Sequence, residues 1–397
     1  MKDLDTEKTE PVGSIKEAIV AGVSVDLFSL KPKKSYSMAG QDYSGQNYFG
    51  VLVRVRTEEG AEGLGEVFVT PGWYGPDSPL SYVYLISQVF TPVLIGKSVF
   101  NTAELVQRMD RLWMGNLWSK AALETALYDA AAKTLGVPLA DLLGGRSRER
   151  FPLVGGVGED TPEEMAHSAR EYVDRGFKTI KLKIGSIADP DLDVARVRLV
   201  REEIGPHVVL RVDANGVYGS DVRGAVKLIR KIEAFDLDHV EQPLSHRQFR
   251  GMARVREAID VPLMADESVH TLEDAHRVID AGAADIVKLK MAKNGGYRKC
   301  SELISACVEA GLRIELGNGI QSSIASFHEL TLACSNPNVM PAGEFPGPDK
   351  LVSDIADHPL QIEDGDALLP IAPGIGTELC EESFQACRID LTALAKG

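Results

Sequence analysis

Short apolar segments alternate with amphipathic helical segments from about residue 150 onward, and this alternation constrains the fold more than any other feature. Such alternation predicts parallel strands with right-handed crossovers, and eight strands predict a closed α/β barrel. An open doubly wound sheet is the alternative, but no G-x-G-x-x-G motif follows the first strand. The eight predicted strands are Leu153–Val157, Thr179–Ile184, Val208–Val212, His239–Gln242, Leu263–Ala265, Ile286–Lys290, Leu312–Leu316 and Val339–Ala342. The helical segments between them include Pro162–Asp174, Leu192–Glu203, Arg223–Ala234, Leu272–Ala281, Gly296–Ala310 and Ile320–Ala333.

The preceding part of the chain has a different pattern. Three segments, Ala18–Phe28, Phe49–Arg56 and Ala61–Val69, are typical of a small antiparallel sheet. Helical periodicity follows from about Ser81 to Leu143 and is clearest in Ser119–Leu135. Because Gly144-Gly145 breaks this pattern, we place the boundary between the two domains there. The predicted organisation is a disordered start at residues 1–13, an α+β domain at 14–144, a barrel at 145–370 and a C-terminal segment at 371–397.

Charged residues close five consecutive predicted strands, at the end where (β/α) barrels carry their chemistry. A single carboxylate after a strand is usually a helix cap or a turn residue. Carboxylates on three successive strands instead converge, and they suit Mg²⁺, with Mn²⁺ as the alternative. The two histidine motifs that would favour zinc, H-x-H on an early strand and H-E-x-x-H, are both absent from the sequence. The five segments are Lys181-Leu182-Lys183, Asp213-Ala214-Asn215, Glu241-Gln242-Pro243, Asp266-Glu267-Ser268 and Lys288-Leu289-Lys290.

The lysines at these strand ends need an explanation of their own. Lys181 and Lys183 share one face of their strand, as do Lys288 and Lys290, because alternate residues point the same way. Ammonium groups beside one another and beside a divalent cation should have a lowered pKa, which would let a lysine act as a base at neutral pH. The alternative is that these lysines only balance the charge of the carboxylates.

Composition and charge limit the class of protein. The chain has 397 residues, enough for about two domains, and a net charge of −15, which disfavours nucleic-acid binding but not a small anionic substrate. Its five cysteines form no C-x-x-C pair, which favours a reduced, cytoplasmic protein. No apolar run approaches the ~18 residues needed to span a membrane. The G-x-x-x-x-G-K-[ST] motif that would indicate phosphoryl transfer is absent.

A loop rich in Gly, Ser and Tyr, Ser35–Tyr48, lies between the first two predicted strands. It is too polar for a core and too aromatic for a simple linker. Two interpretations stay open, a plain surface loop and a loop that covers a substrate.

These motifs, in this order and at this spacing, resemble the enolase superfamily, and within it the muconate-lactonizing (mandelate racemase/muconate lactonizing enzyme) subgroup. The resemblance extends from about Ser14 through the barrel and includes the helix Ala121–Gly145 and the segment Lys290-Met291-Ala292-Lys293-Asn294-Gly295-Gly296. It implies a modified TIM (β/α)7β barrel, an α+β N-terminal capping domain and a C-terminal segment, 371–397, that returns to the cap. It also implies a homo-oligomer.

The resemblance also implies roles for individual residues. Asp213, Glu241 and Asp266 would ligate Mg²⁺. Lys183 and Lys290 would form an acid/base pair on opposite faces of the substrate, and Lys181 would tune Lys183. The mandelate-racemase subgroup places a His after the seventh strand, where this chain has Glu315-Leu316-Gly317-Asn318-Gly319, so a His base is disfavoured.

The implied reaction removes a proton next to a substrate carboxylate. The ene-diolate so formed carries two negative charges, which a metal ion and an ammonium group stabilise. Our leading interpretation is an isomerase that racemises or epimerises an amino-acid derivative or another carboxylate. The alternatives are a muconate-type cycloisomerase, a syn-dehydratase of a hydroxy acid, a non-catalytic metal-binding relative, and a binding barrel that turns nothing over. Predicted substrate contacts are Tyr43, Asn215, Asn318, Gln321 and Glu344.

Overall fold

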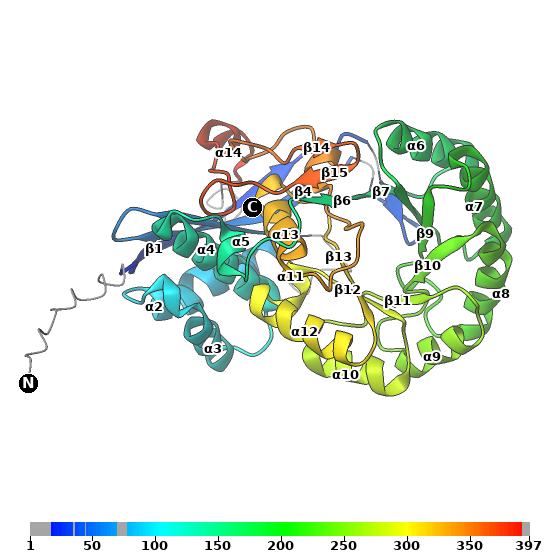
Figure 1. Ribbon diagram of the computed structural model, residues 1–397, viewed down its shortest axis with the longest axis horizontal. Coiled ribbons are helices and arrows are strands. Elements are labelled where there is room, and N and C mark those ends of the chain that lie inside the picture. The colour runs from blue at the N-terminus through cyan, green and yellow to red at the C-terminus, as the bar shows by residue number, and fades with distance from the viewer. Residues whose placement is uncertain (1–16, 35, 44, 70–77, 391–397) are drawn as a thin grey trace, which may run out of the picture.

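The computed structural model describes residues 17–34, 36–43, 45–69 and 78–390. The predicted disordered start at 1–13, and the last residues of the predicted C-terminal segment, lie outside these ranges. Figure 1 shows a ring of strands and helices from β7 to α13, with the N-terminal strands and helices packed beside it. Within the described ranges, no helix combines the length and the apolar character needed to cross a membrane.

The N-terminal part contains a three-stranded antiparallel sheet in the order β1-β4-β5. The strands are β1 (Val20–Leu30), β4 (Tyr48–Thr57) and β5 (Glu62–Val69), so each predicted strand is present. Its central helix is α4 (Leu117–Leu135), which is buried along most of its length. Around it lie α1 (Pro79–Tyr84), a π-helical turn (Leu85–Phe90), α2 (Thr91–Leu94), α3 (Thr102–Leu112) and α5 (Leu139–Leu142).

Strand β5 lies directly against helix α4, and two strand glycines make this close approach geometrically feasible. A Cβ atom on Gly63 would lie 2.0 Å from the carbonyl oxygen of Ala126 and 2.4 Å from the backbone nitrogen of Ala130. A Cβ on Gly65 would lie 2.0 Å from the carbonyl oxygen of Ala122. These neighbours are helix backbone, which cannot move aside as a flexible side chain can.

Gly63→Ala is therefore expected to lower the free energy of unfolding by about 3 kcal/mol or more, because the strand and the helix must separate. Gly22→Ala is the matched control, since a Cβ on this β1 glycine would meet nothing within 4 Å. That variant should be unchanged or stabilised by up to ~1 kcal/mol. Urea unfolding monitored by circular dichroism measures both. Equal stability of the two variants would contradict the close packing of β5 on α4.

The barrel sheet has seven parallel strands in the described residues, each hydrogen-bonded to the next in chain order. The predicted modified barrel with an α+β cap is confirmed. One of its helices, α9, was not named among the predicted helical segments. The strands are β7 (Val154–Val157), β8 (Thr179–Lys183), β9 (Val209–Asp213), β10 (Leu237–Glu241), β11 (Leu263–Ala265), β12 (Ile286–Leu289) and β13 (Arg313–Leu316). The helices are α6 (Pro162–Asp174), α7 (Pro190–Ile204), α8 (Val222–Ile232), α9 (Phe249–Glu257), α10 (Leu272–Ala281), α11 (Met291–Asn294), α12 (Tyr297–Glu309) and α13 (Ser323–Ser335).

The predicted eighth strand, Val339–Ala342, is not a regular strand. This segment and the two residues after it close the ring through isolated parallel bridges, Ile314↔Val339 and Gly317↔Glu344 on one side and Leu153↔Gly343 on the other. Two residues explain the irregularity. Pro341 has no backbone N–H to donate, and Ala342 has a φ of 70°, outside the extended region.

The described end of the chain lies on the N-terminal sheet. Helix α14 (Glu381–Cys387) packs against β1, where the rings of Phe384 and Phe28 lie 6.2 Å apart, centroid to centroid. Glu381 also forms an ion pair with Arg54 of β4. These contacts connect the last described residues to the cap rather than to the bottom of the barrel.

Candidate active site

Three carboxylates lie side by side at the carboxyl end of the barrel sheet. Asp213 ends β9, Glu241 ends β10 and Asp266 directly follows β11. The parallel register pairs Glu241 with Asp213 on one side and with Met264 on the other, so Asp266 lies on the neighbouring strand two residues beyond the level of Glu241. Each carboxylate residue is at most 1% exposed. Three buried carboxylates in one place require positive charge nearby.

Five lysines supply that charge. Lys181 and Lys183 of β8 both contact Asp213, with Nζ to Oδ2 distances of 3.0 Å and 2.5 Å. The Nζ atom of Lys181 is also 2.9 Å from Glu241 Oε2. The remaining contacts of Nζ atoms are Lys288 to Glu241 Oε2 at 3.0 Å, Lys290 to Asp266 Oδ2 at 2.7 Å and Lys293 to Asp266 Oδ1 at 2.8 Å.

The carboxylates fit a divalent cation by their chemistry, although lysine ammonium groups lie between them. Among the described residues, no three His, Cys, Asp or Glu side chains stand together as a ready metal site. Burial, together with the charges of Asp213 and Asp266, raises the pKa of Glu241 to about 8, so the three carboxyl groups are close enough to act on one another. Oxygen ligands from carboxylates are those that Mg²⁺ takes. We conclude that the donor set fits this ion.

The neighbouring carboxylates, rather than the other ammonium groups, determine the pKa of Lys181 and Lys183 in this arrangement, and the lowering predicted beside a divalent cation stays a prediction. Burial alone would lower the pKa of Lys183, but Asp213 attracts its proton more strongly, and the pKa lies well above its ordinary value. The same balance raises the pKa of Lys181, with Glu241 and Glu344 adding to the effect of Asp213. A lysine paired only with carboxylates keeps its proton at neutral pH, whereas a divalent cation held by the same carboxylates would weaken this pairing and lower the lysine pKa.

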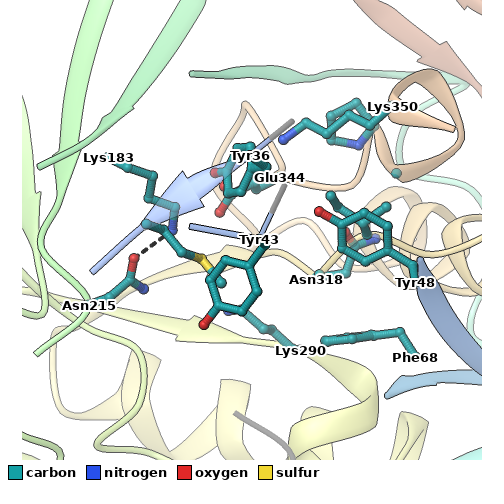
Figure 2. A pocket seen from close by; sticks show the side chains of 15 residues that line it. Tyr36, Tyr43, Tyr48, Phe68, Lys183, Asn215, Lys290, Asn318, Glu344 and Lys350 are labelled. Carbon is teal, nitrogen blue, oxygen red and sulfur yellow. Dashed lines mark hydrogen bonds between the residues drawn. The ribbon is translucent and has the colours of Figure 1, made fainter. Parts of the chain in front are cut away.

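A cavity opens above the strand ends, between the barrel and the cap (Figure 2). Together with its open mouth, it contains about 730 Å³ of space that no protein atom fills. Tyr36, Met38, Tyr43 and Tyr48 of the predicted loop line its cap side, which favours the substrate-covering interpretation over a plain surface loop. Its lining residues are Tyr36, Met38, Tyr43, Tyr48 and Phe68 from the cap, and Lys183, Asn215, Lys290, Asn318, Gly319, Ile320, Glu344, Pro346, Gly347 and Lys350 from the barrel.

Asn215 fixes the position of Lys183. Its Oδ1 atom accepts a hydrogen bond of 2.9 Å from Lys183 Nζ, drawn as a dashed line in Figure 2. Its Nδ2 atom donates to Glu267 Oε1 at 2.9 Å. Asn215 therefore connects a lysine of β8 to a carboxylate after β11.

The structure brings four of the five predicted substrate contacts to the cavity: Tyr43, Asn215, Asn318 and Glu344. Gln321 is not among the lining residues; it is buried, and its backbone faces Gly347. The predicted catalytic Lys181 also lies below the cavity floor, where it contacts Glu344 Oε2 at 2.5 Å.

Sequence reasoning assigned no role to three residues of the site. Lys293 stands in a segment that carries the family resemblance, and its contact with Asp266 follows from its place one helical turn after Lys290. Tyr36 lines the cavity from a segment without regular structure, and Lys350 lines it from the end of a short 3₁₀ helix, Gly347–Lys350. No periodicity in the sequence indicates where the side chains of such segments point.

Comparisons with known proteins agree with this geometry. Residues 24–144 match the family described as mandelate racemase/muconate lactonizing enzyme, N-terminal domain, and residues 164–383 match the family described as enolase C-terminal domain-like. Muconate cycloisomerase 1 of Rhodococcus opacus is 32% identical over 332 residues, which cover 83% of this chain and 88% of the relative. The L-Ala-D/L-Glu epimerase of Bacillus subtilis (strain 168) is 35% identical over 329 residues, 82% of this chain and 88% of the relative.

A solved structure extends the likeness to three dimensions. The crystal structure of muconate lactonizing enzyme from Pseudomonas fluorescens, complexed with muconolactone, superposes with a TM-score of 0.90 at 30% identity, covering 94% of this chain and 100% of that one. Both the cap and the barrel are included in these matches. The chain therefore belongs to the mandelate racemase/muconate lactonizing enzyme family of the enolase superfamily.

Proposed function

We propose that this protein is a Mg²⁺-dependent racemase or epimerase that moves a proton on the carbon next to a substrate carboxylate. The observation that supports it is the placement of two lysines. Lys183 ends β8 and Lys290 follows β12, so the three carboxylate-bearing strands β9, β10 and β11 lie between them. Both lysines line the same cavity, and Figure 2 shows them entering it from different sides.

Two lysines on opposite sides of one carbon can invert its configuration. A neutral lysine takes the proton from one face, and the ammonium group of the other returns a proton to the opposite face. Enzymes of this family generally depend on Mg²⁺. Held by Asp213, Glu241 and Asp266, this ion would supply positive charge that stabilises the substrate carboxylate as a second negative charge develops.

The remaining side chains hold this pair in place. Asn215 orients the Nζ atom of Lys183 through the hydrogen bond described above. Glu344 accepts from Lys181 and from Lys288, so its own charge is neutralised from below the cavity. Tyr43 and Tyr48 of the cap cover the opening and limit the entry of water.

Cycloisomerisation is the second candidate, because the relative from Rhodococcus opacus is named a muconate cycloisomerase and matches 83% of the chain. It uses the same parts with one lysine as the acid/base. Homo-oligomeric assembly stays a prediction.

Deuterium exchange in D₂O separates these functions. We expect the protein with Mg²⁺ to incorporate deuterium next to the carboxylate, and to invert that centre, for at least one class among N-acyl amino acids, dipeptides and hydroxyprolines. Nuclear magnetic resonance and chiral chromatography measure the two events. Conversion of a muconate to a lactone, without inversion of any substrate, would favour the cycloisomerase. No exchange with any of these compounds would contradict proton abstraction, and the Lys183→Met, Lys290→Met double variant gives the background.

A further inference from the structure

Lys350 differs from every other lysine of the cavity. Lys183 and Lys290 both contact carboxylates, at 2.5 Å and 2.7 Å. Among the described residues, no carboxylate lies within ion-pair distance of Lys350, whose Nζ atom instead lies 4.9 Å from the centre of the Tyr36 ring. The adjacent carboxylate, Asp349, is occupied by both terminal nitrogens of Arg175, at 2.8 Å and 3.0 Å. Lys350 thus brings a positive charge to the cavity without a protein counter-ion.

The backbone holds Lys350 firmly in this place. Its carbonyl oxygen accepts a hydrogen bond of 2.9 Å from the backbone nitrogen of Lys33, and Leu351 forms an antiparallel bridge with Pro32. The side chain reaches across to β7, where a Cβ atom on Gly156 would lie 2.9 Å from its Nζ atom. A segment of the cap therefore fixes the backbone of this residue, and the absence of a side chain on Gly156 leaves room for its ammonium group.

Lys350 also stands at the boundary of two cavities. Together with Tyr36 and Ile320, it lines the catalytic cavity and a second one, which lies between the cap segment around Lys33 and helix α6. A substrate that extends from the acid/base lysines toward this second cavity must pass the ammonium group. In Figure 2, Lys350 enters the site from the side of Tyr36, while Lys290 lies below Tyr43.

Burial makes the positive charge of the Lys350 ammonium group energetically unfavourable in the absence of a ligand anion. Burial, with help from Lys183 and Lys181 and against the pull of Glu344, lowers the pKa of Lys350 to about 8. The group is still mainly protonated at neutral pH, but a partly buried ammonium without a counter-ion is unfavourable. A ligand anion would remove that penalty. The neighbouring Glu344 does not attract a ligand cation in its place, because Lys181 and Lys288 both contact it.

We propose that Lys350 binds a second carboxylate of the substrate, remote from the one next to the reacting carbon. The substrate class is then a compound with two carboxylates, one at the acid/base lysines and one at Lys350. This inference rests on the proposed function, because that function places the first carboxylate.

The test compares ligands that differ by one charge. Isothermal titration calorimetry of the full-length protein with Mg²⁺ is carried out with the α,ω-dicarboxylates from succinate to suberate and with monocarboxylates of the same chain lengths. We expect the best dicarboxylate to bind at least about tenfold more tightly than its matched monocarboxylate, as one charge-assisted hydrogen bond implies. In Lys350→Met this ratio should fall to about twofold or less, and in Lys350→Arg it should stay high.

A ratio measured within one variant does not depend on the fraction of protein that is folded. Lys178→Met removes an exposed lysine just before β8 and should keep the wild-type ratio. Equal affinities in the wild type, absence of dicarboxylate binding, or an unchanged ratio in Lys350→Met would each overturn the assignment. Proton exchange on the N-acyl amino acids, dipeptides and hydroxyprolines named above separates the two proposals. Exchange without a charge preference contradicts only the role of Lys350, whereas a charge preference without exchange contradicts only the proposed function.

Discussion

Replacing either Lys183 or Lys290 with methionine is expected to lower turnover by about 10²- to 10⁴-fold, the usual contribution of a general acid or base. In a two-base racemase each variant should stop proton exchange from one enantiomer only, because the lysine on the other face is intact. The measurement is the rate of deuterium incorporation into each enantiomer separately. A one-base enzyme would instead lose turnover mainly through one of the two lysines.

The structure indicates that these variants keep the fold. After Lys183→Met, Asp213 retains its contact with Lys181, and after Lys290→Met, Asp266 retains its contact with Lys293. Neither carboxylate is left buried without a cation, which is the situation that destabilises by several kcal/mol. Lys178→Met, at the opposite end of β8, is the matched control and should keep wild-type rates. Near-wild-type rates in both active-site variants would show that the lysines serve only charge balance.

The parts of the fold that sequence predicted well are those governed by local patterns. Strand β11 and helices α6 and α10 have the predicted bounds, because apolar runs and capping residues such as Thr161 and Thr271 define them locally. The closing segment at Val339 was predicted as a strand since it is apolar, but Pro341 and the φ of Ala342 prevent a regular ladder. Periodicity carries no information on that conformation.

The residues of the site also fall into those that sequence could place and those that it could not. Residues at strand ends could be placed from sequence, because the parallel register of a barrel makes Asp213, Glu241 and Asp266 neighbours. Whether the pKa of Lys183 is raised or lowered could not be predicted from sequence, since it depends on a carboxylate 2.5 Å away rather than on residue type. Tyr36 and Lys350 were missed because contacts between two distant segments position them. Tertiary contacts of this kind leave no spacing in the chain.

Removing Mg²⁺ is expected to abolish activity, and Asp266→Asn is expected to weaken Mg²⁺ binding by about 100-fold or more. Loss of a residue next to a metal ligand already costs 10- to 100-fold in affinity, so loss of a carboxylate ligand should cost at least as much. In the wild type, chelation with EDTA should stop proton exchange, and added Mg²⁺ should restore it. Calorimetric titration of Mg²⁺, together with the rise in melting temperature that Mg²⁺ causes, measures binding independently of turnover.

The variant must be judged by its response to Mg²⁺, because its stability without metal also changes. Asp266 contacts both Lys290 and Lys293, and the neutral amide removes the negative charge that both of these buried ammonium groups contact, a loss of about 3–5 kcal/mol. Asp260→Asn alters an exposed carboxylate shortly before β11 and should respond to Mg²⁺ as the wild type does. If Asp266→Asn bound Mg²⁺ as tightly as Asp260→Asn, the buried carboxylates would serve only to hold the lysines, and the proposed metal site would be wrong.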